Sequence, residues 1–164
     1  MDRSASFEQE LATLLPRLRR FAHTLSRNGA DADDLAQATV ERALRSRAQW
    51  QPGTRLDSWT YRIMRNLWID TTRSRARKQW LEDPPEAAEH LGEDPREAMD
   101  AAMDLKRVMA AMQRLPAEQR EVVALVLIEG FGYRETAEML DLPIGTISSR
   151  LVRGRAALLA LMGE

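Results

Sequence analysis

Residues 57–78 combine basic, aromatic and amide side chains in a way that suits a nucleic-acid contact. At 3.6 residues per turn, one helix face would collect the following polar side chains: Arg62, Asn66, Asp70, Arg73 and Arg77. Trp59 would lie on a second, apolar face, with Tyr61, Arg65 and Trp68 along the flank. Arginine binds phosphate, an amide can read a base edge, and aromatic rings stack on unpaired bases. The pattern therefore favours contact with separating DNA strands, although a solvated helix with its tryptophans in the core fits it equally well.

A second group of polar and basic residues follows a tight turn near the carboxyl end. The spacing predicts a short helix over about residues 133–140, a turn at Asp141-Leu142, and a final helix that starts after Pro143. In that last helix Ile147, Leu151 and Leu158 would face the core. The opposite side would display Thr146, Ser148, Ser149, Arg150, Val152, Arg153 and Arg155. Two helices of this kind are typical of a DNA-binding helix-turn-helix, and an ordinary helical hairpin is the alternative.

The elements that position these groups are all predicted to be helices. An apolar stripe at helical spacing runs from Leu11 to Leu25, and a second follows Asn28-Gly29, with Asp31 or Asp33 as its expected N-cap. The basic stretch is the third helix, from about residue 57 to 78. A further helix is expected to open with Pro116 in its first position. Because no alternating apolar pattern indicates a strand, we expect an all-α fold.

Charge divides the chain into three blocks. The net charge is +6 over residues 1–81, −8 over residues 82–104 and +1 over residues 105–164, so the overall value of −1 hides large local differences. The acidic block contains three prolines and few large apolar residues, which favours a flexible linker or a solvated loop over a packed element. We therefore expect two small helical bundles, 1–81 and 105–164, joined by an acidic linker over 82–104.

Composition argues against most other functions. The chain has no cysteine, and its two histidines, His23 and His90, have no partner at metal-ligand spacing. No phosphate-loop or zinc-protease motif is present, so we expect neither an enzyme nor a cofactor, a metal or a small-molecule substrate. The longest apolar run, residues 122–128, is far shorter than the ~20 residues of a membrane span. We therefore expect a cytoplasmic protein without membrane insertion.

Three motifs, in this order, resemble the bacterial RNA polymerase sigma factors of the extracytoplasmic-function (ECF) group, which belong to the sigma-70 family. Residues 31–43, DADDLAQATVERA, resemble the segment that binds the clamp helices of the polymerase β′ subunit. Residues 59–70, WTYRIMRNLWID, resemble the segment that melts and reads the minus-ten element. Residues 115–120 and 142–150 resemble the region that binds the minus-thirty-five element. The resemblance covers nearly the whole chain.

The resemblance implies an alternative sigma factor that binds core RNA polymerase, recognises and melts promoter DNA, and is controlled by an anti-sigma factor. The resemblance makes the first bundle, residues 1–81, sigma region 2 and the second, residues 105–164, sigma region 4. Region 2 would dock on polymerase through Asp34, Gln37 and Glu41. Next to a loop at about residues 53–58 that accepts a flipped base, minus-ten DNA would meet Trp59, Tyr61, Arg62, Arg65, Asn66, Asp70, Arg73 and Arg77. In region 4, the outward residues of 146–155 would face the minus-thirty-five groove. Ser148 departs from the family, which is often basic at this position.

Two other functions remain open at this point. A sigma-like decoy would sequester an anti-sigma factor and never touch DNA, but such a mimic should have lost its basic face. Here that face is complete: Arg62, Arg65, Arg73, Arg75, Arg77 and Lys78. A conventional helix-turn-helix regulator would not explain the segment that resembles a polymerase-docking site. Transcription with purified core polymerase distinguishes the three functions.

Overall fold

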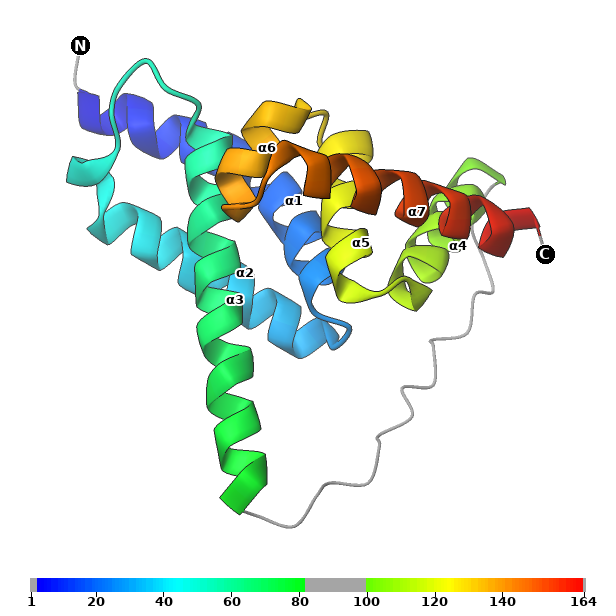
Figure 1. Ribbon diagram of the computed structural model, residues 1–164. Coiled ribbons are helices and arrows are strands. Elements are labelled where there is room, and N and C mark those ends of the chain that lie inside the picture. Colours follow the sequence, from blue (N-terminus) through cyan, green and yellow to red (C-terminus); the bar gives the residue numbers. More distant parts are fainter. Residues whose placement is uncertain (1–2, 82–99, 164) are drawn as a thin grey trace. The chain divides into compact units, whose positions relative to one another are not determined.

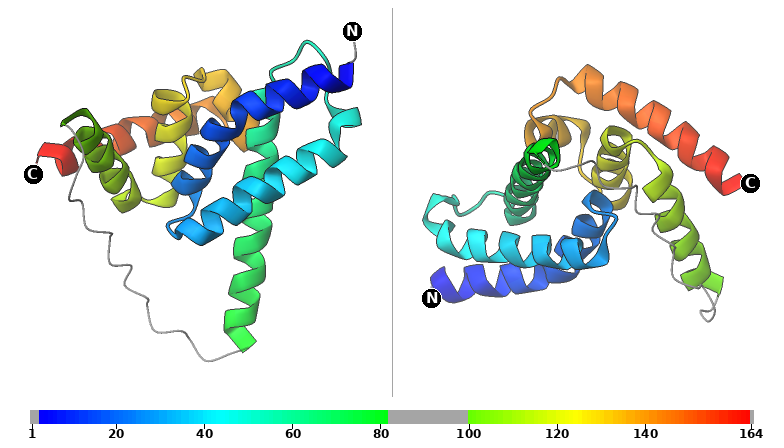
Figure 2. Two further views of the ribbon diagram at one scale, coloured as in Figure 1. Left: turned by 180° about the vertical axis from the view of Figure 1, so that it is seen from behind. Right: turned by 90° about the horizontal axis from the view of Figure 1, so that it is seen from below.

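Every regular element in the part of the chain that the structure describes is a helix, which confirms the predicted all-α class. The computed structural model describes residues 3–81 and 100–163, and these form two compact units (Figures 1 and 2). The first unit contains α1 (Arg3–Leu25), α2 (Gly29–Arg45), the short 3-10 helix η1 (Arg47–Gln49) and α3 (Leu56–Leu81). The second contains α4 (Asp100–Arg114), α5 (Ala117–Val123), the π-helical segment η2 (Ala124–Ile128), α6 (Tyr133–Leu140) and α7 (Ile144–Gly163).

Helices α1, α2 and α3 each pack against the other two, around one apolar core. The predicted stripe of α1 supplies Leu11, Leu18 and Phe21, all at most 3% exposed. Tyr61 and Met64 of α3 complete the centre, and the Tyr61 ring lies 4.9 Å from that of Phe21. Burial of such large side chains is worth roughly 1.5–3 kcal/mol each. The core therefore fixes the orientation of α3 relative to α1 and α2.

The amino-terminal end of α2 is capped by Asn28, not by Asp31 or Asp33 as the sequence suggested. The Asn28 side-chain oxygen accepts hydrogen bonds from the backbone N–H groups of Ala30 (2.9 Å) and Asp31 (3.2 Å). Asp31 therefore lies inside the first turn, where its charge complements the helix dipole. The helix begins two residues before the first predicted cap, at Gly29.

In the second unit, α7 packs against α4, α5 and α6. The predicted inward residues Ile147 and Leu151 are buried, and Leu158 is half-buried. Helix α5 begins one residue later than expected, with Pro116 as its N-cap. Arg120 of α5 is only 5% exposed and donates to the carbonyl oxygen of Leu115 at 3.2 Å. This buried guanidinium therefore satisfies a backbone carbonyl group directly after the end of α4.

The turn between α6 and α7 depends on a residue in the left-handed region. Asp141 has φ = 54°, and it ends α6 at the residue where the sequence predicted the turn. Pro143 then precedes α7, whose first residue is Ile144. Left-handed conformations cost little for glycine, asparagine and aspartate and more for other residues, which explains an aspartate here.

Gly154 allows α5 and α7 to approach closely. A Cβ atom at this position would lie 2.7 Å from Cγ2 of Val123 and 3.2 Å from Cβ of Gln119. Real Cβ atoms do not come this close to a neighbour, so any side chain would push the helices apart. This packing constraint outweighs the cost of about 1 kcal/mol that glycine imposes inside a helix.

The predicted acidic linker lies mostly outside the described residues. Of the stretch 82–104, residues 82–99 are not described, and α4 already begins at Asp100. The helix therefore starts inside the segment that charge assigned to the linker. The charge pattern did not reveal this because Asp100 and Asp104 occupy the first two turns of α4, and acidic residues near a helix amino terminus are favourable.

Candidate nucleic-acid interfaces

One face of α3 presents the polar and basic residues that the sequence placed there. Arg62, Asn66, Asp70, Arg73 and Arg77 are all exposed. Arg65, on the flank, is half-buried. The carboxyl-terminal half of α3 extends beyond α1 and α2, so this face continues past the body of the first unit (Figure 1). The arrangement provides a line of phosphate-binding and base-reading groups along one helix.

Tyr61 does not belong to this face, although the sequence placed it among the DNA-contacting residues. Its side chain is 1% exposed and packs on Phe21, and the guanidinium carbon of Arg17 lies 5.7 Å from its ring centre. A ring buried in this way has no surface to offer a base. Trp59 is half-buried, with its ring 6.2 Å from that of Phe7. The local spacing could not distinguish these two aromatic residues, because the difference depends on where α1 packs.

A hollow of about 170 Å³ lies beside the exposed face of α3. Trp59, Ile63 and Asn66 line one side of it together with Leu67 and Asp70. The opposite side comes from the end of α2 and from η1: Arg42, Ser46 and Gln49. The sequence pattern of α3 does not indicate these last three residues, because they precede that helix and only the packing of α2 on α3 brings them to it. An apolar wall with hydrogen-bonding groups around it is suited to a planar, polar ring.

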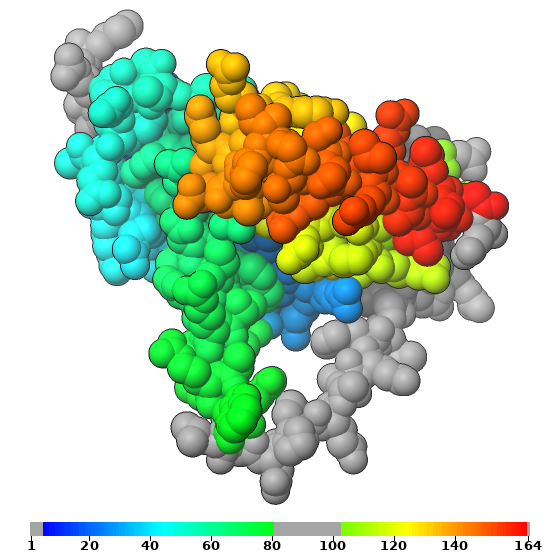
Figure 3. All heavy atoms as spheres, in the orientation of Figure 1, coloured from blue at the N-terminus to red at the C-terminus, as the bar shows by residue number. Residues whose placement is uncertain are grey.

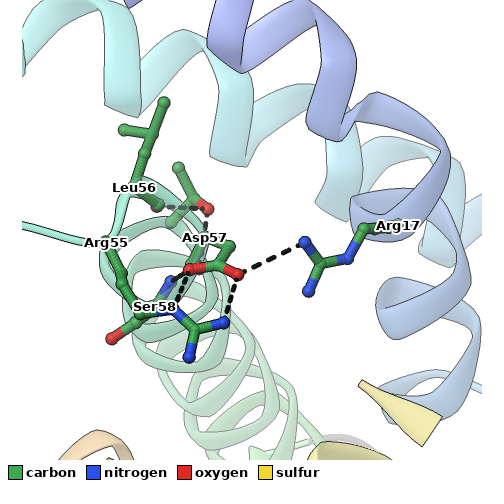
Figure 4. A network of polar contacts seen from close by, with 6 residues as sticks. Arg17, Arg55, Leu56, Asp57 and Ser58 are labelled. Atoms are coloured by element: carbon green, nitrogen blue, oxygen red, sulfur yellow. Dashed lines mark hydrogen bonds and ion pairs between the residues drawn. The ribbon is translucent and has the colours of Figure 1, made fainter. Parts of the chain in front are cut away.

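The start of α3 is fixed by the carboxylate of Asp57 (Figure 4). Arg17 of α1 donates to its Oδ2 at 3.2 Å, and Arg55 donates to both oxygens at 2.9 and 3.2 Å. The backbone N–H of Ser58 donates to Oδ1 at 2.8 Å. These bonds tie the loop before α3 to α1 and to the helix itself. The loop that the resemblance assigns to a flipped base, residues 53–58, therefore has an anchored end.

This network also sets the charge state of Asp57. Burial raises the pKa of the carboxyl, but hydrogen bonds from Arg55 and the Ser58 N–H, with the charges of Arg55 and Arg17, more than offset that effect. The pKa is therefore held below the usual aspartate value of 3.8. A carboxylate that accepts several hydrogen bonds favours its ionised form.

Arg75 makes an ion pair on the α2 side of α3. Its two guanidinium nitrogens donate to the two oxygens of Asp31 at 2.7 and 2.9 Å. This bidentate hydrogen bond raises the pKa of Arg75 above its ordinary value. The sequence pattern places Arg75 with the basic face. In the structure it instead fastens the carboxyl-terminal half of α3 to the amino-terminal turn of α2.

Helix α7 presents its own exposed strip. Ser149, Val152, Arg153 and Arg155 are exposed, and Val152 is 66% exposed, which is high for an aliphatic residue. Thr146 and Ser148 are half-buried. Arg150 is also half-buried, with its guanidinium 3.6 Å from the carboxylate of Glu118 in α5. A convex helix face that carries hydroxyl, aliphatic and guanidinium groups is suited to base edges in the major groove.

The predicted docking residues lie together on α2. Asp34, Gln37 and Glu41 are exposed, and the side-chain amide of Gln37 donates to Glu41 at 3.5 Å. Gln37 and Glu41 also line a hollow of about 580 Å³ between α1 and α2, together with the charged Arg19 and Asp33 and the apolar Leu15, Ala36 and Val40. The surface therefore mixes polar and apolar groups, as protein interfaces commonly do.

The described residues offer no candidate for two other kinds of site. In residues 3–81 and 100–163, no three histidine or acidic side chains gather where they could hold a metal ion. Within the same ranges, no helix has the length and apolar character needed to cross a membrane. The faces of α2, α3 and α7 are therefore the candidate interfaces.

Comparison with known families assigns both units. Residues 11–78 match Sigma-70 region 2, and residues 105–158 match Sigma-70, region 4. The chain is 37% identical to the ECF RNA polymerase sigma factor EcfG of Rhodopseudomonas palustris, over 96% of this chain and 85% of the relative.

Solved structures agree with this assignment. The sigma factor RpoE of Bartonella quintana, in complex with the anti-sigma factor NepR, has a TM-score of 0.83 at 32% identity and covers 96% of this chain and 97% of its own. CnrH, a sigma factor known from Cupriavidus metallidurans, was solved with the cytosolic domain of CnrY. Its TM-score is 0.68 at 25% identity, and the match covers 97% of this chain and 88% of CnrH. This chain therefore belongs to the extracytoplasmic-function sigma factors of bacterial RNA polymerase.

Proposed function

We propose that three helix faces divide the work of this sigma factor in transcription initiation. The exposed face of α3 binds the minus-ten element and holds it open, the strip on α7 reads the minus-thirty-five element, and the face of α2 docks on the clamp helices of core polymerase. The carrying observation is the line of exposed Arg62, Asn66, Arg73 and Arg77 beside the hollow of Trp59. A protein that never met DNA would have no use for this combination.

The hollow beside α3 gives the opening step a physical basis. A base that leaves the duplex loses stacking and pairing worth a few kcal/mol. The indole of Trp59 can replace part of the stacking, and Asn66, Gln49 and Ser46 can replace the hydrogen bonds. We place the extruded base in this hollow. The anchored loop, residues 53–58, directly precedes Trp59 in the sequence.

Two further parts of the proposal come from the relatives. Both solved sigma factors described above were captured with another protein, NepR in one case and the cytosolic domain of CnrY in the other. We propose that this chain is likewise held by an anti-sigma factor and acts in the cytoplasm, where polymerase and promoters are. The hollow between α1 and α2, with its mixture of polar and apolar side chains, supports a protein partner on that face.

The decisive experiment is transcription with purified core polymerase on a promoter found by mapping transcripts after overexpression. A sigma factor yields specific transcripts. A decoy yields none but still binds an anti-sigma factor, and a conventional regulator yields none without a separate sigma factor. Absence of initiation in the reconstituted reaction would refute the proposal.

Asn66→Ala tests the role of α3 within that reaction. We expect promoter opening, followed by permanganate reactivity of unpaired thymines, to fall roughly tenfold, because the variant loses one hydrogen-bonding partner of a displaced base. Binding of the closed complex, measured at low temperature, should change little. Equal loss in both steps would show that Asn66 contacts duplex DNA and not a separated strand.

A further inference from the structure

The last turn of α3 contains a tryptophan that is almost fully exposed. Trp80 is 92% exposed, the highest value among the large hydrophobic side chains of the described residues. Isolated hydrophobic residues are common on protein surfaces and need no explanation by themselves. The position of Trp80 on the helix is what gives it meaning.

Trp80 lies in line with the proposed DNA-binding residues. It follows Arg62 by 18 residues, which is five turns at 3.6 residues per turn and about 27 Å along the helix axis. Arg73 and Arg77 precede it by seven and three residues, so both lie on the same side. The face that begins at Arg62 therefore continues by one further turn and ends in an aromatic ring.

The Asp31–Arg75 ion pair keeps this side of the helix away from α2. Arg75 faces α2 and is held there by two hydrogen bonds. Five residues later, Trp80 points about 140° away around the helix. Figures 1 and 3 show the carboxyl-terminal half of α3 projecting beyond α1 and α2. Within its own unit, the indole therefore has both ring faces available.

The neighbours of Trp80 define the chemistry of its ligand. Arg73, Arg77 and Lys78 are exposed cations within two turns, which favours a polyanion over an apolar protein surface. An indole among such cations is a common arrangement in proteins that bind single-stranded nucleic acid, where cations hold the phosphates and a base stacks on the ring. A paired base in a duplex has both of its faces covered by its neighbours. The ring therefore suits a base that has left the duplex.

We infer that Trp80 stacks on an unpaired promoter base at an end of the melted segment, while Arg73, Arg77 and Lys78 bind the adjoining phosphates. This inference rests on the proposed role of the α3 face and extends it by one contact. Trp80 lies outside the segment that matches Sigma-70 region 2, which ends at residue 78.

The test compares two promoter fragments, each with holoenzyme made from the full chain and core polymerase. The first is forked, with the minus-ten segment unpaired, and the second is the same sequence fully paired and kept closed at low temperature. Trp80→Ala should weaken binding to the forked fragment about 5- to 150-fold, the range that stacking of one base accounts for. Binding to the closed duplex should stay within about twofold.

Three variants make the result specific. Trp80→Phe keeps an aromatic face and should retain most of the affinity. Gln79→Ala, an exposed neighbour on another side of the helix, should behave like the unaltered protein. Crosslinking of 5-iodouracil placed along the unpaired strand should reach Trp80 at one or two adjacent positions. Assembly with core polymerase in the absence of DNA should be equal for all variants.

The outcomes separate this inference from the proposed function. Equal weakening on forked and paired DNA would overturn stacking, and weaker assembly with polymerase would show that Trp80 contacts protein. If Trp80→Ala has no effect while Arg62→Ala weakens forked DNA, only the inference fails. If neither variant weakens forked DNA, the proposed role of the α3 face fails as well.

Discussion

Helices α3 and α7 carry similar residues in very different surroundings. The 26-residue α3 extends well beyond its neighbours and borders a hollow lined with polar groups, whereas α7 is packed so closely on α5 that only glycine fits at position 154. A projecting helix beside a hollow can hold a separated strand, and a firmly seated helix with a convex face can read an intact groove. Arginine and hydroxyl chemistry is common to both, so the packing decides which form of DNA each helix suits.

The two units can be followed separately in solution. All four tryptophans, at positions 50, 59, 68 and 80, are in the first unit, and the second unit has none. Intrinsic fluorescence therefore reports unfolding of the first unit, while the helical circular dichroism signal reports both. The two signals together therefore tell which unit a substitution destabilises.

Gly154→Val should destabilise the second unit by about 3 kcal/mol, because a branched side chain must enter a space where even a Cβ atom would lie 2.7 Å from Val123. Urea titration of the full chain should show an earlier circular dichroism transition and an unchanged fluorescence transition. Gly145→Val is the matched control on the same helix. A Cβ at position 145 meets no atom within 4 Å, and stability there should change by less than about 0.5 kcal/mol. Similar losses in the two variants would disprove close packing as the reason for Gly154.

Arg153→Ala should weaken promoter binding by about 1–3 kcal/mol if its guanidinium makes a specific contact to a base at minus-thirty-five. The measurement is binding of holoenzyme to promoters that vary one base at a time in that element. Discrimination should relax at one position only. An unchanged preference at every position would remove Arg153 from the reading face.

Asp57→Asn should destabilise the first unit by about 1 kcal/mol at neutral pH, seen as an earlier fluorescence transition. Because the folded state lowers the pKa of Asp57, its contribution is complete above the usual value of 3.8 and is lost as the pH falls through the lower, folded value. The difference between the variant and the unaltered protein should therefore shrink as the pH falls below about 4. A constant difference across pH would show that the carboxylate charge is not what stabilises the loop.

Local patterns predicted the second unit better than the first. The short helix over 133–140, the turn at Asp141 and the inward residues of α7 agree with the structure because each depends on neighbours within a few residues. Two predictions for the first unit were less accurate. Asp31 is not the cap of α2, because Asn28 three residues earlier takes that place. Arg75, expected on the basic face, instead pairs with Asp31, which lies 44 residues away.

The candidate site shows the same limit. Helical spacing gave the exposed side of α3 correctly for Arg62, Asn66 and Arg73. It could not show that Tyr61 packs on Phe21, or that Arg42, Ser46 and Gln49 complete a hollow with Trp59. These features arise where α1 and α2 pack against α3, which no single-helix pattern contains. Gly154 is a similar case, since its reason is the side chain of Val123 on another helix.

The left-handed backbone at Asp141 limits how this DNA-reading unit can evolve. Only a few residue types adopt this conformation at low cost, so most substitutions at position 141 are unfavourable. The strip of α7 that follows the turn is exposed, so its side chains can change without disturbing the core. The turn can therefore stay constant while the reading face is rewritten. A lineage could acquire a new promoter set through substitutions on α7 alone, without losing the geometry that presents it.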